Sequence, residues 1–154
     1  MRELSHPHVI KLHYIYESAN YVHMILEYLR GGELFEQIKK KKKFKEKECR
    51  EIAKLFLETI DYVHSLNIIH RDLKPENIFF SNHLTFNTSH YKRSNDDYST
   101  FKVVDFGLAT IIHPPELVFT KCGSPGFVAP EILKKVGYGT QADIFSIGVI
   151  IFIL

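Results

Sequence analysis

The chain has 154 residues, of which 45% are hydrophobic and 25% charged, a composition typical of one soluble globular domain. Its formal net charge of +2 is too small to indicate a nucleic-acid-binding protein. The two cysteines lie far apart, which suits a reducing compartment, and the longest apolar run, 147–154, is well short of the roughly 18 residues of a membrane span. We therefore expect a cytoplasmic protein with no membrane span and no nucleic-acid partner, and leave a nuclear location open.

The first quarter of the chain predicts an antiparallel hairpin, a linker and a short helix. Residues 9–16 and 21–27 are rich in β-branched and aromatic side chains, and the turn-forming segment 18–20 lies between them. Two glycines in 28–32 interrupt the pattern, as in a linker. Residues 33–40 then have the composition of a short helix.

The clearest helix is predicted over residues 46–67. Apolar residues recur along one stripe at helical spacing: Ile52, Ala53, Phe56, Leu57, Ile60 and Val63. Short apolar runs at 78–80 and 101–104 predict a second hairpin, and the sequence from 141 onward predicts the first half of a buried helix. A few strands followed mainly by helices indicate an α+β fold with two lobes.

Residues 81–100 interrupt the second hairpin. The segment is dense in Ser, Thr, Asn, Asp and charged residues and offers little to bury, so it predicts a mobile surface loop. A tolerated loop extension is the simpler interpretation, because insertions in surface loops cost little closure entropy. The alternative is a regulatory segment that is phosphorylated on one of its hydroxyls.

Three short motifs carry the chemistry of the sequence. They are HRDLKPEN at 70–77, DFG at 105–107 and APE at 129–131. Asp72 is a candidate to accept a proton from a substrate hydroxyl, and Lys74 to neutralise a phosphate in transfer. Asn77 and Asp105 supply the hard oxygen ligands that Mg²⁺ prefers. Together these residue types indicate a phosphoryl-transfer site.

On these motifs the chain resembles the eukaryotic protein kinase family, and the similarity extends from residue 1 to residue 154. The resemblance implies a truncated kinase-like fold. Residues 1–27 would be a remnant of the small lobe, 28–32 the hinge, and 33–154 the large lobe with the insertion 81–100. It also implies ATP and Mg²⁺ as cofactors. Lysine at position 74 resembles serine/threonine kinases, so the expected substrate is a Ser or Thr hydroxyl of a protein.

The resemblance also assigns a nucleotide site. Backbone groups of Glu27, Tyr28 and Leu29 would hydrogen-bond adenine, and Leu26 would be the gatekeeper before them. Phe79 would pack beneath the adenine ring. These residues define the expected hinge side of an ATP pocket.

Further positions match family residues with known places in the fold. Glu33 matches an acidic residue that contacts ribose, although a solvated glutamate favoured by the helix dipole is an equal alternative. Leu12, His70 and Phe106 resemble members of a hydrophobic stack that couples the lobes. Asp143 would anchor the backbone of the catalytic loop.

Regulation is also implied. Ser124 stands where its hydroxyl would bridge Asp72 and Lys74. Thr120 aligns with an activation-loop phosphosite, and its phosphate would pair with Arg71 after the action of an upstream activating kinase. The alternative is an unmodified loop threonine.

The segments 31–35 (GGELF) and 122–127 (CGSPGF) look closest to calcium/calmodulin-dependent and related basophilic kinases. Glu33 and Glu76 would then read a basic residue upstream of the target hydroxyl. Lysines at 39–43, 45 and 47 are read as a solvated basic face, with a patch for a partner or an anionic surface as the alternative.

The sequence contains no Gly-x-Gly-x-x-Gly loop and no Val-Ala-Ile-Lys lysine, both of which the family uses to hold ATP. We therefore expect the chain to be the middle of a kinase domain, weakly stable and poor at transfer by itself. A fragment of a working kinase is the favoured interpretation. The alternatives are a truncated kinase-like binding module without catalysis, and a scaffold that holds magnesium-ATP without transferring phosphate.

Overall fold

The computed structural model describes residues 1–41, 43–81 and 101–154. The elements in chain order are β1 (Leu12–Glu17), β2 (Val22–Leu26), α1 (Leu34–Lys41), α2 (Glu46–Ser65), β3 (Ile68–Ile69), β4 (Ile78–Phe80), β5 (Phe101–Val103), β6 (Thr110–Ile111), α3 (Pro130–Leu133) and α4 (Gln141–Phe152). They form three antiparallel pairs, β1–β2, β3–β6 and β4–β5. The predicted loop 81–100 lies outside the described residues from 82 onward.

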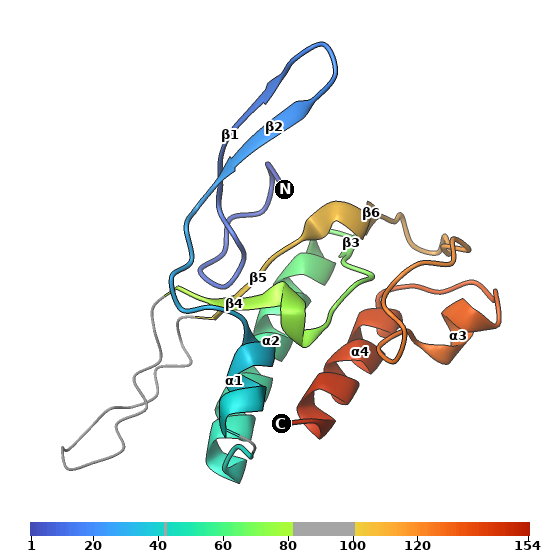
Figure 1. Cartoon of the computed structure of the whole chain (residues 1–154). Coiled ribbons are helices and arrows are strands. Elements are labelled where there is room, and N and C mark those ends of the chain that lie inside the picture. The colour runs from blue at the N-terminus through green and yellow to red at the C-terminus, as the bar shows by residue number, and fades with distance from the viewer. Residues whose placement is uncertain (42, 82–100) are drawn as a thin grey trace.

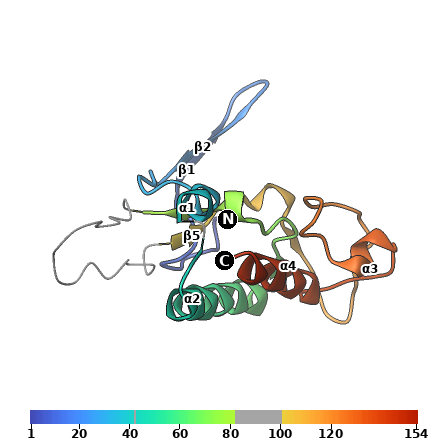
Figure 2. The same ribbon diagram turned by 60° about the horizontal axis from the view of Figure 1, so that its bottom comes forward.

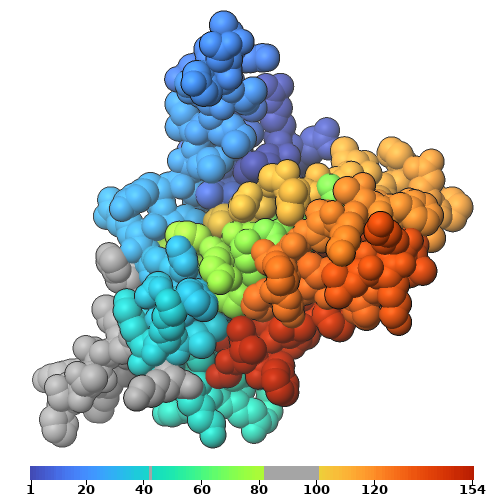
Figure 3. Space-filling model, turned by 45° about the vertical axis from the view of Figure 1, so that its right-hand side comes forward, coloured from blue at the N-terminus to red at the C-terminus, as the bar shows by residue number. Residues whose placement is uncertain are grey.

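The β1–β2 hairpin stands away from the helical body (Figures 1 and 3). Strand β1 begins three residues later than predicted, because Val9 does not continue the hairpin. Val9 instead forms a parallel bridge with Val103 of β5 and is only 2% exposed. Leu4 also belongs to the main hydrophobic cluster, so the first residues of the chain pack against the helical body.

Helix α2 confirms the predicted periodicity with one error. Lys45 donates its backbone N–H to the Glu48 carboxylate (2.6 Å), which satisfies a free donor at the helix start. Leu57 is 43% exposed, so its predicted place on the buried stripe is wrong. Thr59 is buried on this face instead. Its hydroxyl donates to Leu55 O, so the hydroxyl has a hydrogen-bond partner in the interior.

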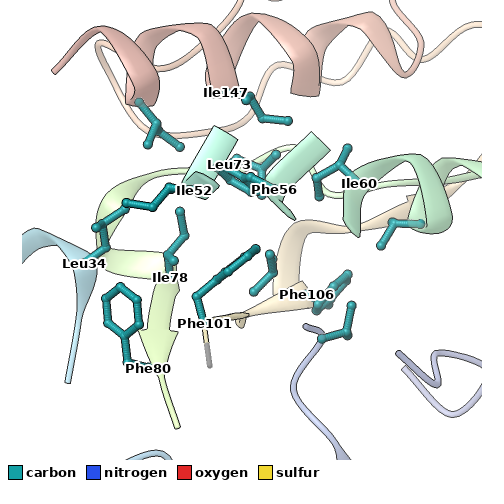
Figure 4. Close-up of a cluster of buried hydrophobic side chains, with 14 of the residues drawn as sticks. Leu34, Ile52, Phe56, Ile60, Leu73, Ile78, Phe80, Phe101, Phe106 and Ile147 are labelled. Carbon is teal, nitrogen blue, oxygen red and sulfur yellow. The ribbon is translucent and has the colours of Figure 1, made fainter. Parts of the chain in front are cut away.

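The main hydrophobic core lies between α2, α4 and the β4–β5 pair (Figures 2 and 4). Phe56 of α2 meets Phe101 of β5 edge to face, with ring centroids 5.9 Å apart. Ile147 of α4 belongs to the same cluster, and helices α2 and α4 run side by side. This core supports the loop between β3 and β4, which carries residues 70–77. Within the described residues, no helix combines the length and apolarity needed to cross a bilayer.

Candidate functional site

The loop after β3 is fixed to helix α4 by one buried carboxylate. Asp143 is fully buried; its Oδ1 accepts the N–H of Arg71, and its Oδ2 accepts the N–H of His70, both at 2.9 Å. The Nε2 of His64, in α2, also forms a hydrogen bond with Oδ2 (2.8 Å). Arg71 is thereby held at a φ of 70°, a conformation that costs energy for a residue other than glycine. These hydrogen bonds confirm the expected anchoring role of Asp143.

His70 joins the same loop to the end of β5. Its Nε2 donates to Val104 O (3.0 Å), and its Nδ1 accepts the N–H of Asp72 (3.3 Å). Burial lowers the pKa of His70, which favours the neutral ring that both bonds require. Val104 in turn donates its N–H to Asn77 O (3.0 Å). Two loops distant in sequence therefore meet just before Asp105.

Asp72 lies at the centre of a compact polar network. Ser124 donates its hydroxyl to Asp72 Oδ1 (2.7 Å), and Lys74 Nζ donates to Asp72 Oδ2 (2.9 Å) and Ser124 Oγ (2.8 Å). Asn77 Nδ2 donates to Asp72 O (2.9 Å) and more weakly to Oδ2 (3.3 Å). Burial alone raises the pKa of Asp72, but these hydrogen bonds and the Lys74 charge together hold that pKa below its ordinary value. The predicted bridge by Ser124 is present, and Asp72 is ionised at neutral pH.

Two glycines permit the close approaches in the site. Gly123 has a φ of 105°, and a Cβ there would lie 2.7 Å from Arg71 O. Only glycine therefore lets the chain bring Ser124 against the loop. A Cβ on Gly107 would lie 2.9 Å from Asp105 Oδ1, which instead accepts the Gly107 N–H at 3.1 Å.

A cavity of about 680 Å³ lies between the hairpin and the end of β5, a size typical of ligand sites. Its lining includes Leu12, Leu26, Glu27, Tyr28, Leu29, Phe79, Val104, Asp105 and Phe106. Four of the five predicted nucleotide-contacting residues are therefore in one cavity. The fifth, Glu33, does not line it but forms a bridge with the backbone of Phe79.

The segment after β2 is held by a contact that the sequence did not reveal. The Glu27 carboxylate accepts the backbone N–H of Lys11 (2.7 Å) and pairs with Lys102 Nζ (2.8 Å), while Glu27 N donates to Lys11 O (3.0 Å). Lys102 lies in β5, shortly before Asp105. Within the described residues, the backbone N–H and C=O of Leu29 make no hydrogen bond. The segment after β2 is thus tied to β5 and, within the described residues, keeps the backbone groups of Leu29 without a hydrogen bond.

The expected stack is formed in part. The rings of His70 and Phe106 meet edge to face with centroids 4.7 Å apart. Leu12 lines the cavity with Phe106.

Glu76, in the turn before β4, buries a carboxylate oxygen that has no hydrogen-bond partner within the described residues.

The predicted regulatory residues are connected through a tyrosine that the sequence did not single out. Thr120 is exposed, and its carbonyl accepts the Tyr138 hydroxyl at 2.6 Å. Arg71 donates its Nε–H to Leu108 O (2.6 Å). Burial raises the pKa of Tyr138, an effect that the nearby Arg71 opposes. Tyr138 therefore lies between Arg71 and the backbone of Thr120.

Comparisons with known proteins identify the family. Residues 1–154 match the protein kinase domain, so the chain belongs to the protein kinase family, which generally uses ATP and Mg²⁺. It is 41% identical to "Probable serine/threonine-protein kinase 2" of Plasmodium falciparum over 99% of its length. It is 42% identical to "Probable serine/threonine-protein kinase fhkD" of Dictyostelium discoideum over 100%, and 39% identical to calcium/calmodulin-dependent protein kinase type IV of Mus musculus over 98%.

The chain spans 27%, 21% and 30% of the lengths of these three relatives. The matches confirm the predicted family, its serine/threonine type and the α+β kinase fold.

Proposed function

We propose that this chain forms the catalytic part of a protein serine/threonine kinase, which transfers the γ-phosphate of ATP to Ser or Thr hydroxyls of proteins. The observation that carries the proposal is the ionised Asp72 held by Lys74 and Ser124. Asp72 orients the incoming hydroxyl and accepts its proton, while Lys74 offsets negative charge on the moving phosphate. Positioning and charge compensation are most of what this reaction asks of a protein.

The cavity supports binding of the adenine ring. The free backbone groups of Leu29 and the carbonyl of Glu27 are the hydrogen-bonding partners we assign to adenine, and Phe79 is the apolar surface beneath it. Glu33, beside Phe79, is assigned to the ribose.

The chemistry of the donor set fits Mg²⁺. The amide nitrogen of Asn77 is engaged by Asp72, which leaves its Oδ1 as the available ligand atom. Asp105 adds a carboxylate that is exposed on the cavity side. Two protein oxygens plus phosphate oxygens suit this ion, which neutralises phosphate charge when bound.

The proposal extends to substrate and regulation. The buried Glu76 oxygen, which has no hydrogen-bond partner among the described residues, supports, together with Glu33, selection of a basic residue upstream of the target hydroxyl. The exposed Thr120 is assigned as the site of an upstream activating kinase, with Arg71 as the partner of its phosphate. Two free cysteines support a cytoplasmic location.

The test is phosphate transfer from radiolabelled ATP to matched serine and tyrosine peptides by the protein that carries this sequence. We expect transfer to the serine peptide only, and a loss of at least about 100-fold in Asp72→Asn. Asp61→Asn, an exposed carboxylate on α2, is the matched control and should retain full activity. Equal activity in Asp72→Asn, or equal transfer to tyrosine, would contradict the proposal. Magnesium-ATP binding without any transfer would favour the scaffold alternative.

A further inference from the structure

The lysine-rich segment where α1 ends and α2 begins carries charge that the chain does not neutralise. Its seven lysines are Lys39, Lys40, Lys41, Lys42, Lys43, Lys45 and Lys47, of which Lys42 lies outside the described residues. Five of the described lysines are exposed, and Lys39 among them pairs with Glu36. We call the other four, Lys40, Lys43, Lys45 and Lys47, the lysine patch.

Every carboxylate of residues 36–48 is already engaged by another cation. Glu36 pairs with Lys39 (3.2 Å), and Glu46 pairs with Arg50 (2.9 Å). Glu48 pairs with Lys41 (2.5 Å). Within the described residues, the patch lysines make no ion pair. On a solvated face of alternating charges, the patch lysines would share these carboxylates. Here the carboxylates pair with other cations, so the patch keeps its positive charge.

The segment is held in place rather than left to fluctuate. Phe44, in the middle of the patch, is 3% exposed and belongs to the main core. Its N–H donates to Leu154 O at 3.0 Å. Lysines on either side of Phe44 therefore project from an anchored backbone, so less conformational freedom is lost when a ligand binds them.

We propose that the lysine patch adsorbs the protein onto an anionic phospholipid surface. The segment 39–47 contains seven lysines and no arginine, which suits diffuse attraction to many headgroups rather than bidentate recognition of one phosphate. None of the patch lysines lines the cavity beside Glu27 and Asp105, so the patch is an exposed surface and not part of that cavity. Between 36 and 51, no described residue is an exposed large apolar side chain, so adsorption is electrostatic and does not require insertion.

The geometry leaves the candidate active site accessible. The α1–α2 junction lies at the end of the molecule away from the tip of the β1–β2 hairpin (Figures 1 and 3). Helix α1, of eight residues and about 12 Å in length, has Glu33 just before its start and the patch at its end. A bilayer touching the patch therefore does not cover the cavity. This inference does not depend on phosphoryl transfer.

The test is sedimentation of the chain with vesicles of phosphatidylcholine alone and with phosphatidylserine added at about a 7:3 ratio. We expect binding to the anionic vesicles only, weakened strongly between about 0.1 M and about 0.5 M salt. The variant K40Q/K43Q/K45Q/K47Q should bind at least about tenfold more weakly. The control K54Q/K121Q/K134Q/K135Q removes the same number of exposed charges elsewhere and should change binding less than about twofold.

Circular dichroism of both variants checks that the fold is retained. Three outcomes would overturn the proposal: no binding to the anionic vesicles, equal loss in both variants, or capture by a poly-glutamate peptide without vesicle binding. The last result would assign the patch to an acidic protein partner.

Discussion

The loop at residues 70–77 and the β1–β2 hairpin are stabilised in opposite ways. The loop is nearly buried, and its polar groups are held by Asp143, His70 and Ser124. The hairpin exposes large side chains on both strands, including Tyr14, Tyr16, Val22, Met24 and Ile25. It depends on its own ladder and on the Glu27–Lys102 pair.

The difference shows which part of the molecule is preorganised. In the loop, Asp72, Lys74 and Asn77 have fixed partners before any ligand arrives, which is the condition for electrostatic catalysis. The hairpin has few buried contacts, so it opens at lower free energy than the core. We therefore infer that the loop sets the chemistry and that the hairpin adapts to the ligand.

The largest effect is expected for Asp143→Ala. Removing this carboxylate leaves three donors without this acceptor, a buried one on His70 and part-buried ones on His64 and Arg71. We expect a loss of about 3 kcal/mol or more in the free energy of unfolding, measured by urea denaturation. Asp61→Ala, at an exposed position of α2, is the control and should change little. A loss below about 1 kcal/mol for Asp143→Ala would mean that the loop is not held by this carboxylate.

Ser124→Ala tests the network around Asp72. Loss of the hydroxyl bond should cost about 1 kcal/mol near neutral pH. Because the pKa of Asp72 is lowered by folding, its contribution to stability is fully present above the unfolded pKa of about 3.9 and is lost as pH falls through the lower folded value.

The variant should therefore lose less stability than the wild type between about pH 6 and about pH 3. Denaturation at both pH values measures this difference. Ser65→Ala, which removes a hydroxyl bonded only to Tyr62 O, should leave the pH dependence unchanged. An unchanged pH dependence in Ser124→Ala would show that the hydroxyl does not influence Asp72.

The Glu27–Lys102 pair sharpens the account of the hairpin. Both side chains are mostly buried, at 21% and 14% exposure. A double-mutant cycle with Glu27→Gln and Lys102→Met should give a coupling of about 1 kcal/mol. Hydrogen exchange in β1 and β2 should quicken in either single variant, while exchange in α2 should not. Quickening in α2 to the same extent would mean that the hairpin and core unfold together.

The smallest effect is expected at the hairpin tip. Tyr21 is 70% exposed, so Tyr21→Ser should change the free energy of unfolding by less than about 0.5 kcal/mol. Thermal denaturation beside the Asp143→Ala variant measures the contrast directly. A loss above about 1.5 kcal/mol would show that Tyr21 is packed in the folded protein, contrary to its exposure here.

Much of this arrangement can be predicted from the sequence. The spacing of Ile52, Phe56 and Ile60 predicts the buried face of α2 because side chains three to four apart share a helix face. The motifs at 70–77 and 105–107 locate the polar groups, since each short segment fixes its own local turn. The prediction for Leu57 was wrong because helical spacing does not tell how wide the buried face of the helix is. Thr59 is buried on that face instead.

Contacts between distant segments could not be predicted. His64 meets Asp143 across 79 residues, and Lys102 meets Glu27 only because β5 passes beside the end of β2. Tyr138 carries no local signal for its bond to Thr120. Such pairs depend on tertiary packing, which brings together residues whose own neighbourhoods look ordinary.

The central claim is that Asp72, Asn77 and Asp105 converge on one magnesium-bound nucleotide. Calorimetric titration of ATP with and without Mg²⁺, in the wild type and in Asp105→Asn, tests it most directly. Asparagine keeps an acceptor for the Gly107 N–H but loses the charge. The account predicts that Mg²⁺ tightens ATP binding at least about tenfold in the wild type and has little effect in the variant. Equal tightening by Mg²⁺ in both proteins would contradict it.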